Sequence, residues 1–378
     1  MSVPPGSGVI SFARGVPSPD LLPACELAEA SRRAFERHSA TALNYGPPAG
    51  FRPLAERLGD LHGTAPGRIL ITPGSYILLT LLTRVLAGRG PVLIEVPAYD
   101  RMNSLLRQAG AEVAAVPRRG DGIDLAALEH CLTTAGRRPA FLYAMPTVHN
   151  PTGTTTPLPD RERLADLAVR HNLLVVEDDP YGQLRFGGEL VPSLHSLLEA
   201  RGAGHLAVFA SSFSKIVAPG LRVGYGVLPE QLAGPVTRAA QETYVSPPLW
   251  PQAVVEEFLA AGFLPAHLDR IRAELRQRRD ALTERLEAGL GGQARWTVPD
   301  GGYFLWLELP GGLRSADLLT DCEQAGVTFA PGAGFCCRGG GEHSARVCFS
   351  SAGPGDIRTG ADRLTAAARR RLSRAGAA

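Results

Sequence analysis

The chain has 378 residues, of which 44% are hydrophobic and 20% charged, and its 39 basic residues nearly balance 37 acidic ones. This is the profile of a soluble globular protein long enough for a large core and a second domain. A net charge of +2 gives no basic surplus for nucleic acid, and no apolar run approaches the ~18–20 residues of a membrane span. We therefore expect neither a nucleic-acid nor a membrane partner.

The N-terminus lacks a charged region followed by an apolar core, so no secretory signal is expected. The cysteines form no Cys-x-x-Cys pair, and the histidines make no cluster with metal-ligand spacing, which argues against zinc and against a disulfide framework. The six cysteines are Cys25, Cys131, Cys322, Cys336, Cys337 and Cys348. A reducing cytoplasm is the expected location.

Residues 1–45 are rich in Pro and Gly and contain one helical pattern, Ala24–His38. From about residue 65 to 230, short apolar runs alternate with helical patterns such as Pro159–His171. The runs expected to be buried strands are Val92–Val96, Phe141–Met145, Leu173–Glu177 and Leu206–Ala210. This alternation predicts an α/β fold with a mostly parallel sheet that is covered by helices on both faces.

Residues Pro251 to about Leu290 carry a strong helical pattern with one apolar face. The following apolar segments, Tyr303–Leu309 and Ala345–Ser350, predict strands of a second, smaller α+β domain. The expected division is an N-terminal arm with part of the small domain (1–45), a large domain (46–275) and a C-terminal small domain (276–378). The helix near residues 268–290 is expected to join the two domains.

A possible catalytic lysine, Lys215, follows the apolar run Leu206–Ala210. Ser212 and Ser214 precede it, and Arg222 follows it. Hydroxyls, an amine and a guanidinium in one turn suit a phosphate whose carrier forms a Schiff base with the lysine. Taken alone, the segment also fits a solvated lysine after a strand.

Other runs that are expected to be buried strands are also followed by residues that could bind a cofactor. Open α/β sheets bind their ligands at these strand ends. Tyr99 could stack on a flat cofactor, and Asn150 could bind one of its oxygens. Asp178 could pair with a pyridinium nitrogen, and Tyr181 could donate to a ring oxygen. Each also has a plain alternative as a loop tyrosine, a turn residue or a charged loop entry.

A further turn, at Gly74 and Ser75, leads into the apolar helix Ile77–Leu86. Gly74 allows a tight turn and Ser75 is expected to be the N-cap, so the helix N-terminus could hold a phosphate. An ordinary capped core helix is the alternative. Together, the turns along this sheet supply a phosphate cradle, a ring stacker, a pyridinium partner, a ring-oxygen donor and a lysine.

As a set, these residues resemble the fold type I aminotransferases of class I/II, which use pyridoxal 5′-phosphate (PLP). The chain looks like the branch with 2-aminoadipate aminotransferases, kynurenine aminotransferases and MocR-like proteins. The segments that carry the resemblance are Asn150–Gly153, Asp178–Tyr181 and Ser212–Arg222, within a match from Phe12 to Ser350. The resemblance implies the PLP-dependent transferase fold type I and a PLP cofactor.

The resemblance also implies a role for each residue. Lys215 would bind PLP covalently and later move a proton between Cα and C4′. Asp178 would keep the pyridine nitrogen protonated, Tyr181 and Asn150 would bind the phenolic oxygen, and Tyr99 would stack on the ring. The implied phosphate ligands are Ser75, the Tyr76 backbone, Ser212, Ser214 and Arg222.

Three further residues match family positions outside the cofactor turns. Arg346 would clamp the substrate α-carboxylate with Asn150 nearby, and the backbone of Gly15 would lie close to the substrate. Tyr45 resembles the tyrosine that reaches the phosphate of the partner subunit, which implies a homodimer with shared sites. Relatives often carry Gln at the position of Tyr76, so the pocket near the substrate is expected to differ in shape.

The predicted function is a ping-pong aminotransferase acting on an L-amino acid and a 2-oxo acid. A PLP-dependent lyase, cyclase or oxidase on the same scaffold is the alternative. A MocR-type regulator is less expected, because the aminotransferase-like pattern begins near Phe12 and leaves no room for a DNA-binding domain. Arg14, Arg101 and the segment Ser31–Arg33 could meet an acidic substrate side chain or could be solvated.

Overall fold

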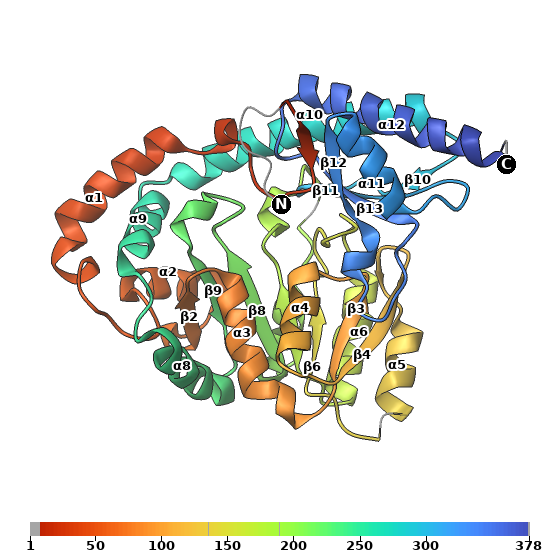
Figure 1. The fold of residues 1–378 in the computed structure, drawn as a ribbon. Helices are drawn as coiled ribbons and strands as arrows, with labels where there is room; N and C mark the ends of the chain where they lie inside the picture. The colour runs from red at the N-terminus through yellow and green to blue at the C-terminus, as the bar shows by residue number, and fades with distance from the viewer. Residues whose placement is uncertain (1–7, 135, 189, 377–378) are drawn as a thin grey trace.

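The computed structural model describes residues 8–134, 136–188 and 190–376. Two β-sheets organise them, with helices packed around both (Figure 1). The larger sheet has eight strands in the order β2-β9-β8-β7-β6-β3-β4-β5. Its strands are β2 (Ile69–Thr72), β3 (Val92–Val96), β4 (Val113–Arg119), β5 (Gly122–Ile123), β6 (Phe141–Ala144), β7 (Val175–Asp178), β8 (Ala207–Ser212) and β9 (Gly224–Val227).

The central strands β4, β3, β6, β7 and β8 pair in parallel, whereas β9 is antiparallel to both of its neighbours. This confirms the predicted mostly parallel sheet. Register places Asp178 beside Ala210, so the ends of β7 and β8 meet at one edge of the sheet. Asp178, the last residue of β7, and the turns that carry Asn150 and Lys215 therefore all lie at the carboxyl edge of the sheet.

Successive strand residues point to opposite faces of this sheet, and each face has its own core. Tyr143 and Val176 belong to a core that includes α3 and α8, whereas their neighbours Leu142 and Val175 belong to a second core with α5, α6 and α7. Burial on both faces explains why the strands are continuous apolar runs. The helices of this region are α2 (Arg52–His62), α3 (Ser75–Leu86), α4 (Asp100–Gln108), α5 (Leu125–Thr134), α6 (Leu158–Arg170), α7 (Leu194–Ala200) and α8 (Glu230–Tyr244).

The smaller sheet joins the two ends of the described chain. Its order is β1-β12-β13-β11-β10, and only the β1–β12 pair is parallel. The elements are β1 (Ile10–Phe12), β10 (Arg295–Trp296), β11 (Phe304–Glu308), β12 (Val327–Pro331), β13 (Ser344–Cys348), α11 (Ser315–Gln324) and α12 (Pro354–Gly376). The domain boundaries after residues 45 and 275 stay predictions.

The helical pattern predicted from Pro251 to Leu290 is wrong as one helix. It forms α9 (Leu249–Ala260) and α10 (Phe263–Leu290), because Gly262 takes a left-handed φ of 73° that ends the first helix. The N-terminal helix α1 (Ala24–Ala42) packs against α9 and extends beyond the predicted His38. In Figure 1, α10 and α12 lie side by side above the smaller sheet.

Short 3-10 turns connect many of these elements. The predicted strand start at Leu206 is one example, since Leu206 ends a 3-10 turn and β8 begins at Ala207. The turns are η1 (Pro19–Leu21), η2 (Pro66–Arg68), η3 (Ala87–Arg89), η4 (Gly182–Leu184), η5 (Gly204–Leu206), η6 (Pro219–Leu221) and η7 (Gly332–Phe335).

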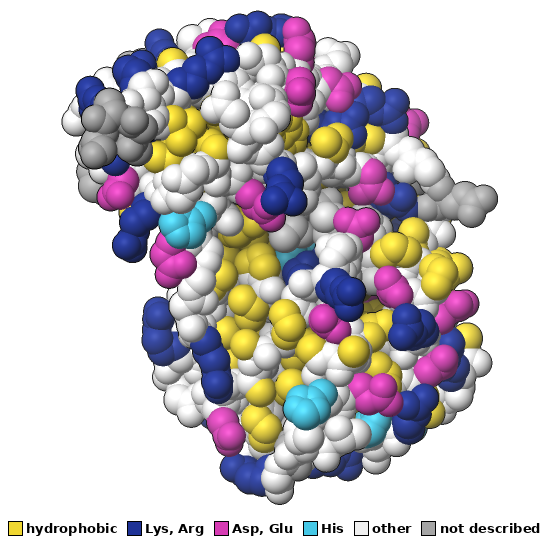
Figure 2. Space-filling model, turned by 90° about the vertical axis from the view of Figure 1, so that its right-hand side faces the viewer, with side chains coloured by type: hydrophobic (Ala, Val, Ile, Leu, Met, Phe, Trp, Pro, Cys, Tyr) yellow, Lys and Arg dark blue, Asp and Glu magenta, His cyan; other side chains and the backbone are white. Residues whose placement is uncertain are grey.

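Acidic and basic side chains are interspersed over the face shown in Figure 2, as the near-balanced composition implies. Within the described ranges, no helix is both long and apolar enough to cross a membrane. All six cysteines are free thiols.

Candidate active site

A cavity of about 390 Å³ lies at the carboxyl edge of the large sheet, where β11 and β13 of the smaller sheet also reach it. It brings together residues that are far apart in the sequence, from Gly15 to Arg346. The predicted site residues that line it are Gly15, Ser75, Tyr76, Tyr99, Asn150, Asp178, Tyr181, Ser212, Ser214, Lys215, Arg222 and Arg346. Tyr45 is the predicted residue that does not line it.

Lys215 reaches into this cavity from the turn after β8. Its Nζ donates to the carbonyl oxygen of Gly15 at 2.6 Å and lies 5.8 and 5.5 Å from the ring centroids of Tyr181 and Tyr303. Burial lowers the pKa of Lys215 to about 8. Because Lys215 is also the only lysine in the sequence, it is the one side-chain amine that can act as a nucleophile at neutral pH.

Only one of the two carboxylate oxygens of Asp178 has a hydrogen-bond partner among the described residues. Its Oδ2 accepts a hydrogen bond from the Tyr143 hydroxyl at 2.7 Å, whereas its buried Oδ1 has no hydrogen-bond partner among the described residues. Burial raises the pKa of Asp178 to about 7. A buried, unpaired oxygen of this kind is costly unless a ligand donor faces it, so the site fits the protonated ring nitrogen of PLP.

Tyr143 was not among the predicted site residues, although a sequence signal existed. It is the one residue with a polar group in the apolar run Phe141–Met145, and a buried hydroxyl needs a partner. Tyr303 was also missed; its hydroxyl donates to the Lys215 carbonyl at 2.9 Å and fixes the backbone of the lysine.

The guanidinium of Arg222 lies between the turn before α3 and the turn after β8. Arg222 has a left-handed φ of 52°, and its guanidinium donates to the Ser214 hydroxyl at 3.3 Å and to the Pro73 carbonyl at 3.2 Å. Gly74, with a φ of 91°, lies so close that a Cβ there would collide with this guanidinium. The turns before α3 and after β8 therefore form one cationic cradle of the kind that a phosphate requires.

One detail of the cradle differs from the sequence expectation. Gly74 is the N-cap residue of α3 and Ser75 is the first helical residue, so the predicted capping role of Ser75 is wrong. The extended ψ of 153° at Gly74 places the helix boundary one residue earlier. The Ser212 hydroxyl binds backbone, since it donates to the Val223 carbonyl and accepts from the Ser214 N–H.

Arg346 lies on β13 and lines the same cavity. Its Nη1 donates to Asn150 Oδ1 at 2.9 Å and its Nη2 to the Ala13 carbonyl at 2.8 Å, whereas its buried Nε has no hydrogen-bond partner among the described residues. Its Cζ lies 4.2 Å from the ring centroid of Phe304 and 4.8 Å from that of Phe335. This fixed guanidinium with spare donors suits a carboxylate.

The remaining candidates divide into two groups. Arg14 and Arg101 line the cavity and are exposed, and neither side chain makes a hydrogen bond or ion pair within the described ranges. In contrast, Arg32 and Arg33 bind Glu29 on the same helix, α1, as ordinary surface arginines do.

Tyr45 is 84% exposed and lies outside the cavity, in a separate hollow that Leu43 and Trp250 also line.

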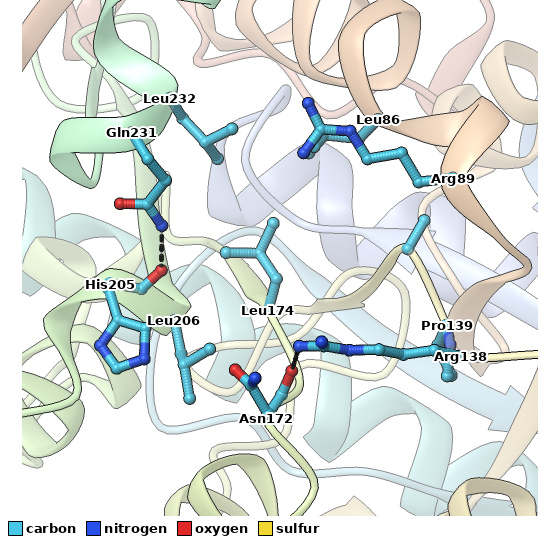
Figure 3. Close-up of a pocket in the computed structure, with 11 residues that line it drawn as sticks. Leu86, Arg89, Arg138, Pro139, Asn172, Leu174, His205, Leu206, Gln231 and Leu232 are labelled. Atoms are coloured by element: carbon cyan, nitrogen blue, oxygen red, sulfur yellow. Dashed lines mark hydrogen bonds between the residues drawn. The ribbon is translucent and has the colours of Figure 1, made fainter.

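Another hollow, of about 300 Å³, lies at the amino edge of the large sheet and is shown in Figure 3. Leu174 and Leu206 form part of its apolar wall, and Gln231 donates to the His205 carbonyl beside it. With neither lysine nor acid in its lining, it lacks the groups for amine chemistry.

Comparisons with known proteins show the family of the chain. The family model of aminotransferase class I and II matches residues 7–364. The chain is 38% identical to the 2-aminoadipate transaminase of Thermus thermophilus over 359 residues, which cover 94% of this chain and 89% of that protein. It is 30% identical to aromatic-amino-acid aminotransferase 1 of Thermococcus litoralis, over 95% of this chain and 87% of that one.

The fold is similar to a solved structure of LysN, the alpha-aminoadipate aminotransferase of Thermus thermophilus, complexed with N-(5′-phosphopyridoxyl)-L-leucine. The TM-score is 0.92 at 37% identity, and the match covers 97% of this chain and 94% of that one. The chain therefore belongs to the class I and II aminotransferases, fold type I enzymes that use PLP to transfer an amino group between an amino acid and a 2-oxo acid.

Proposed function

We propose that the cavity residues divide the work of transamination among three regions. Arg222, Ser214 and the N-terminus of α3 would hold the phosphate, and Asp178 the ring nitrogen. Tyr99 would lie against the cofactor ring, and Tyr181 and Asn150 would bind the phenolic oxygen of that ring. Ser75, the Tyr76 backbone and Ser212 would complete the phosphate cradle. Bound PLP supplies an electron-poor ring that stabilises negative charge on the substrate carbon. The observation that carries this proposal is the free Oδ1 of Asp178 in the same cavity as the only lysine.

Lys215 would act first as the nucleophile that binds the cofactor and then as the base that moves a proton between Cα and C4′. Both tasks need a neutral amine, and burial favours that form. The Gly15 carbonyl, 2.6 Å from Nζ, would hold the amine on the substrate side. An amino acid would leave as its 2-oxo acid before a second 2-oxo acid enters, which gives ping-pong kinetics.

Attachment of PLP to the cofactor-free protein should depend on pH through Lys215. With a pKa lowered to about 8, the neutral amine predominates above that value and the protonated amine below it. The rate of attachment should rise as pH increases to about 8 and level off above it. Stopped-flow absorbance between pH 6 and pH 10 (roughly two units on either side of the pKa) would measure this; a rate that keeps rising steeply above pH 9 would contradict the lowered pKa.

Arg346 would bind the substrate α-carboxylate. Replacement Arg346→Lys keeps a positive charge but loses the planar fork, so we expect KM for the amino donor to rise about 10- to 100-fold, the value of a charged hydrogen bond. The change in kcat should be smaller. Steady-state kinetics would check this, and an unchanged KM in a folded variant would remove Arg346 from the substrate site.

The preferred substrates are proposed to have an acidic side chain. Arg14 and Arg101 line the cavity without an ion-pair partner in the described ranges, and a relative is named for 2-aminoadipate. A panel of amino donors with 2-oxoglutarate as acceptor would test this, together with the single variants Arg14→Ala and Arg101→Ala. Equal use of acidic and apolar donors by the native protein would contradict the proposal.

A homodimer with shared sites is proposed from an exposed apolar surface near Tyr45. Phe35, Leu43, Tyr45 and Val245 are between 58% and 84% exposed, which is unusual for large apolar side chains that stay in solvent. Covering this surface with a second copy would bury it and bring Tyr45 to the partner's phosphate. Light scattering should give about twice the chain mass of 40.0 kDa, and a fully active monomer would contradict the shared site.

The enzyme is proposed to work in the cytoplasm, where its six free thiols would stay reduced. Cell fractionation with an antibody would test the location; recovery outside the cytoplasmic fraction would refute it.

A further inference from the structure

We propose that Phe335 is a positioning residue that holds Arg346 ready for the substrate carboxylate and ties it to the loop that carries Tyr99. The inference rests on the proposed role of Arg346 as the carboxylate ligand. Phe335 does not line the cavity; it acts through Arg346 and Ala98, both of which it contacts.

The ring of Phe335 lies directly against the guanidinium. The Arg346 Cζ is 4.8 Å from the Phe335 ring centroid and 4.2 Å from that of Phe304, distances at which a cation is attracted to an aromatic ring. Both rings are buried, and Arg346 itself is only 8% exposed. The attraction therefore acts where little water competes.

The backbone of Phe335 makes a second connection. Its carbonyl oxygen accepts a hydrogen bond from the Ala98 N–H at 2.8 Å. Ala98 immediately precedes Tyr99, which lines the cavity and caps α4. One residue of η7 thus contacts both the arginine on the smaller sheet and the loop after β3 on the larger sheet.

Phe335 is itself held in place. It is 3% exposed, and its ring meets that of Trp306 edge to face, with centroids 5.7 Å apart. Trp306 pairs with Arg346 across β11 and β13. The ring position is therefore fixed by the same strand pair that carries the arginine.

This arrangement orders the guanidinium before substrate arrives. An arginine that is free to rotate loses side-chain entropy when it binds, and a fixed one does not. Two of its donors already bind Asn150 and Ala13, and the rings limit rotation of the plane. Loss of the Phe335 ring should therefore weaken substrate binding while the chemical steps continue.

The test compares Phe335→Leu with Phe335→Tyr, which keeps the ring. Phe335→Leu should raise KM for the amino donor about 3- to 30-fold, the range expected for a buried cation–π contact, with kcat within about threefold. Phe335→Tyr should restore KM to within about threefold of the native value. Phe186→Leu is a matched control, because Phe186 also faces an arginine, Arg279 at 5.2 Å, but Arg279, unlike Arg346, does not line the cavity.

The same kinetics in an Arg346→Lys background separate this inference from the role of Arg346. If Phe335 acts through the guanidinium, Phe335→Leu should have a much smaller effect in that background. An equal effect in both backgrounds, or no change in KM for folded Phe335→Leu, would overturn the positioning role. No effect of Arg346→Lys alone would instead overturn the role of Arg346. If Phe335→Leu does not fold, Phe335→Met replaces it in the same comparison.

Discussion

Replacement of Lys215 by alanine is expected to lower turnover by about 10⁴-fold or more, because both the nucleophile and the base are lost. The visible absorption that covalent attachment gives to bound PLP should also disappear. No other side-chain amine exists in the sequence, so none can substitute for Lys215. Transamination assays and absorption spectra of the purified variant would measure both losses.

Lys215→Arg is the matched variant, since it keeps the positive charge without a titratable amine. It should be as inactive as the alanine variant while still binding the phosphate through the Arg222 cradle. Borohydride reduction of the native holoenzyme should attach one cofactor per chain, at Lys215, as read by mass spectrometry. Native-like turnover in either variant would refute the role of Lys215.

Asp178→Asn should have the second-largest effect. An amide cannot balance a buried pyridinium, and breaking a buried charge pair in this way costs about 3–5 kcal/mol, or about 150- to 5,000-fold in kcat/KM. The reason lies in the geometry, since Oδ1 is buried without a partner in the described ranges and is free to face the ring nitrogen.

Tyr143→Phe provides the matched comparison for Asp178. It removes the 2.7 Å hydrogen bond to Oδ2 but leaves Oδ1 and the charge in place. Its effect on kcat/KM should be about 10- to 100-fold at most, the value of one hydrogen bond to a charged acceptor, and smaller than that of Asp178→Asn. Equal losses in Tyr143→Phe and Asp178→Asn would show that Asp178 acts through the local structure and not through its charge on the cofactor.

The sequence was informative where a residue follows a strongly apolar strand. Asn150, Asp178 and Lys215 follow runs whose burial is plain from composition, and parallel strands bring their ends to one edge. The same logic missed β1, which has only three residues, and β9, in which two of the four residues are glycines.

Contacts between distant side chains could not be predicted in this way. The hydrogen bond from Tyr143 to Asp178 and the contact of Phe335 with Arg346 depend on rotamers and on the packing of two sheets. The break at Gly262 was equally hidden, because an apolar helical pattern continues on both sides of it. A glycine within such a pattern fits either a continuous helix or a left-handed end.

Transamination is tested most directly by the first half-reaction alone. The purified holoenzyme would be mixed with a panel of amino donors, acidic ones included, without any 2-oxo acid acceptor. We predict that at least one donor converts the bound cofactor to pyridoxamine phosphate and releases an equal amount of the matching 2-oxo acid, and that Lys215→Ala does neither. Consumption of donors by the holoenzyme without any pyridoxamine phosphate would contradict transamination and favour a lyase, cyclase or oxidase.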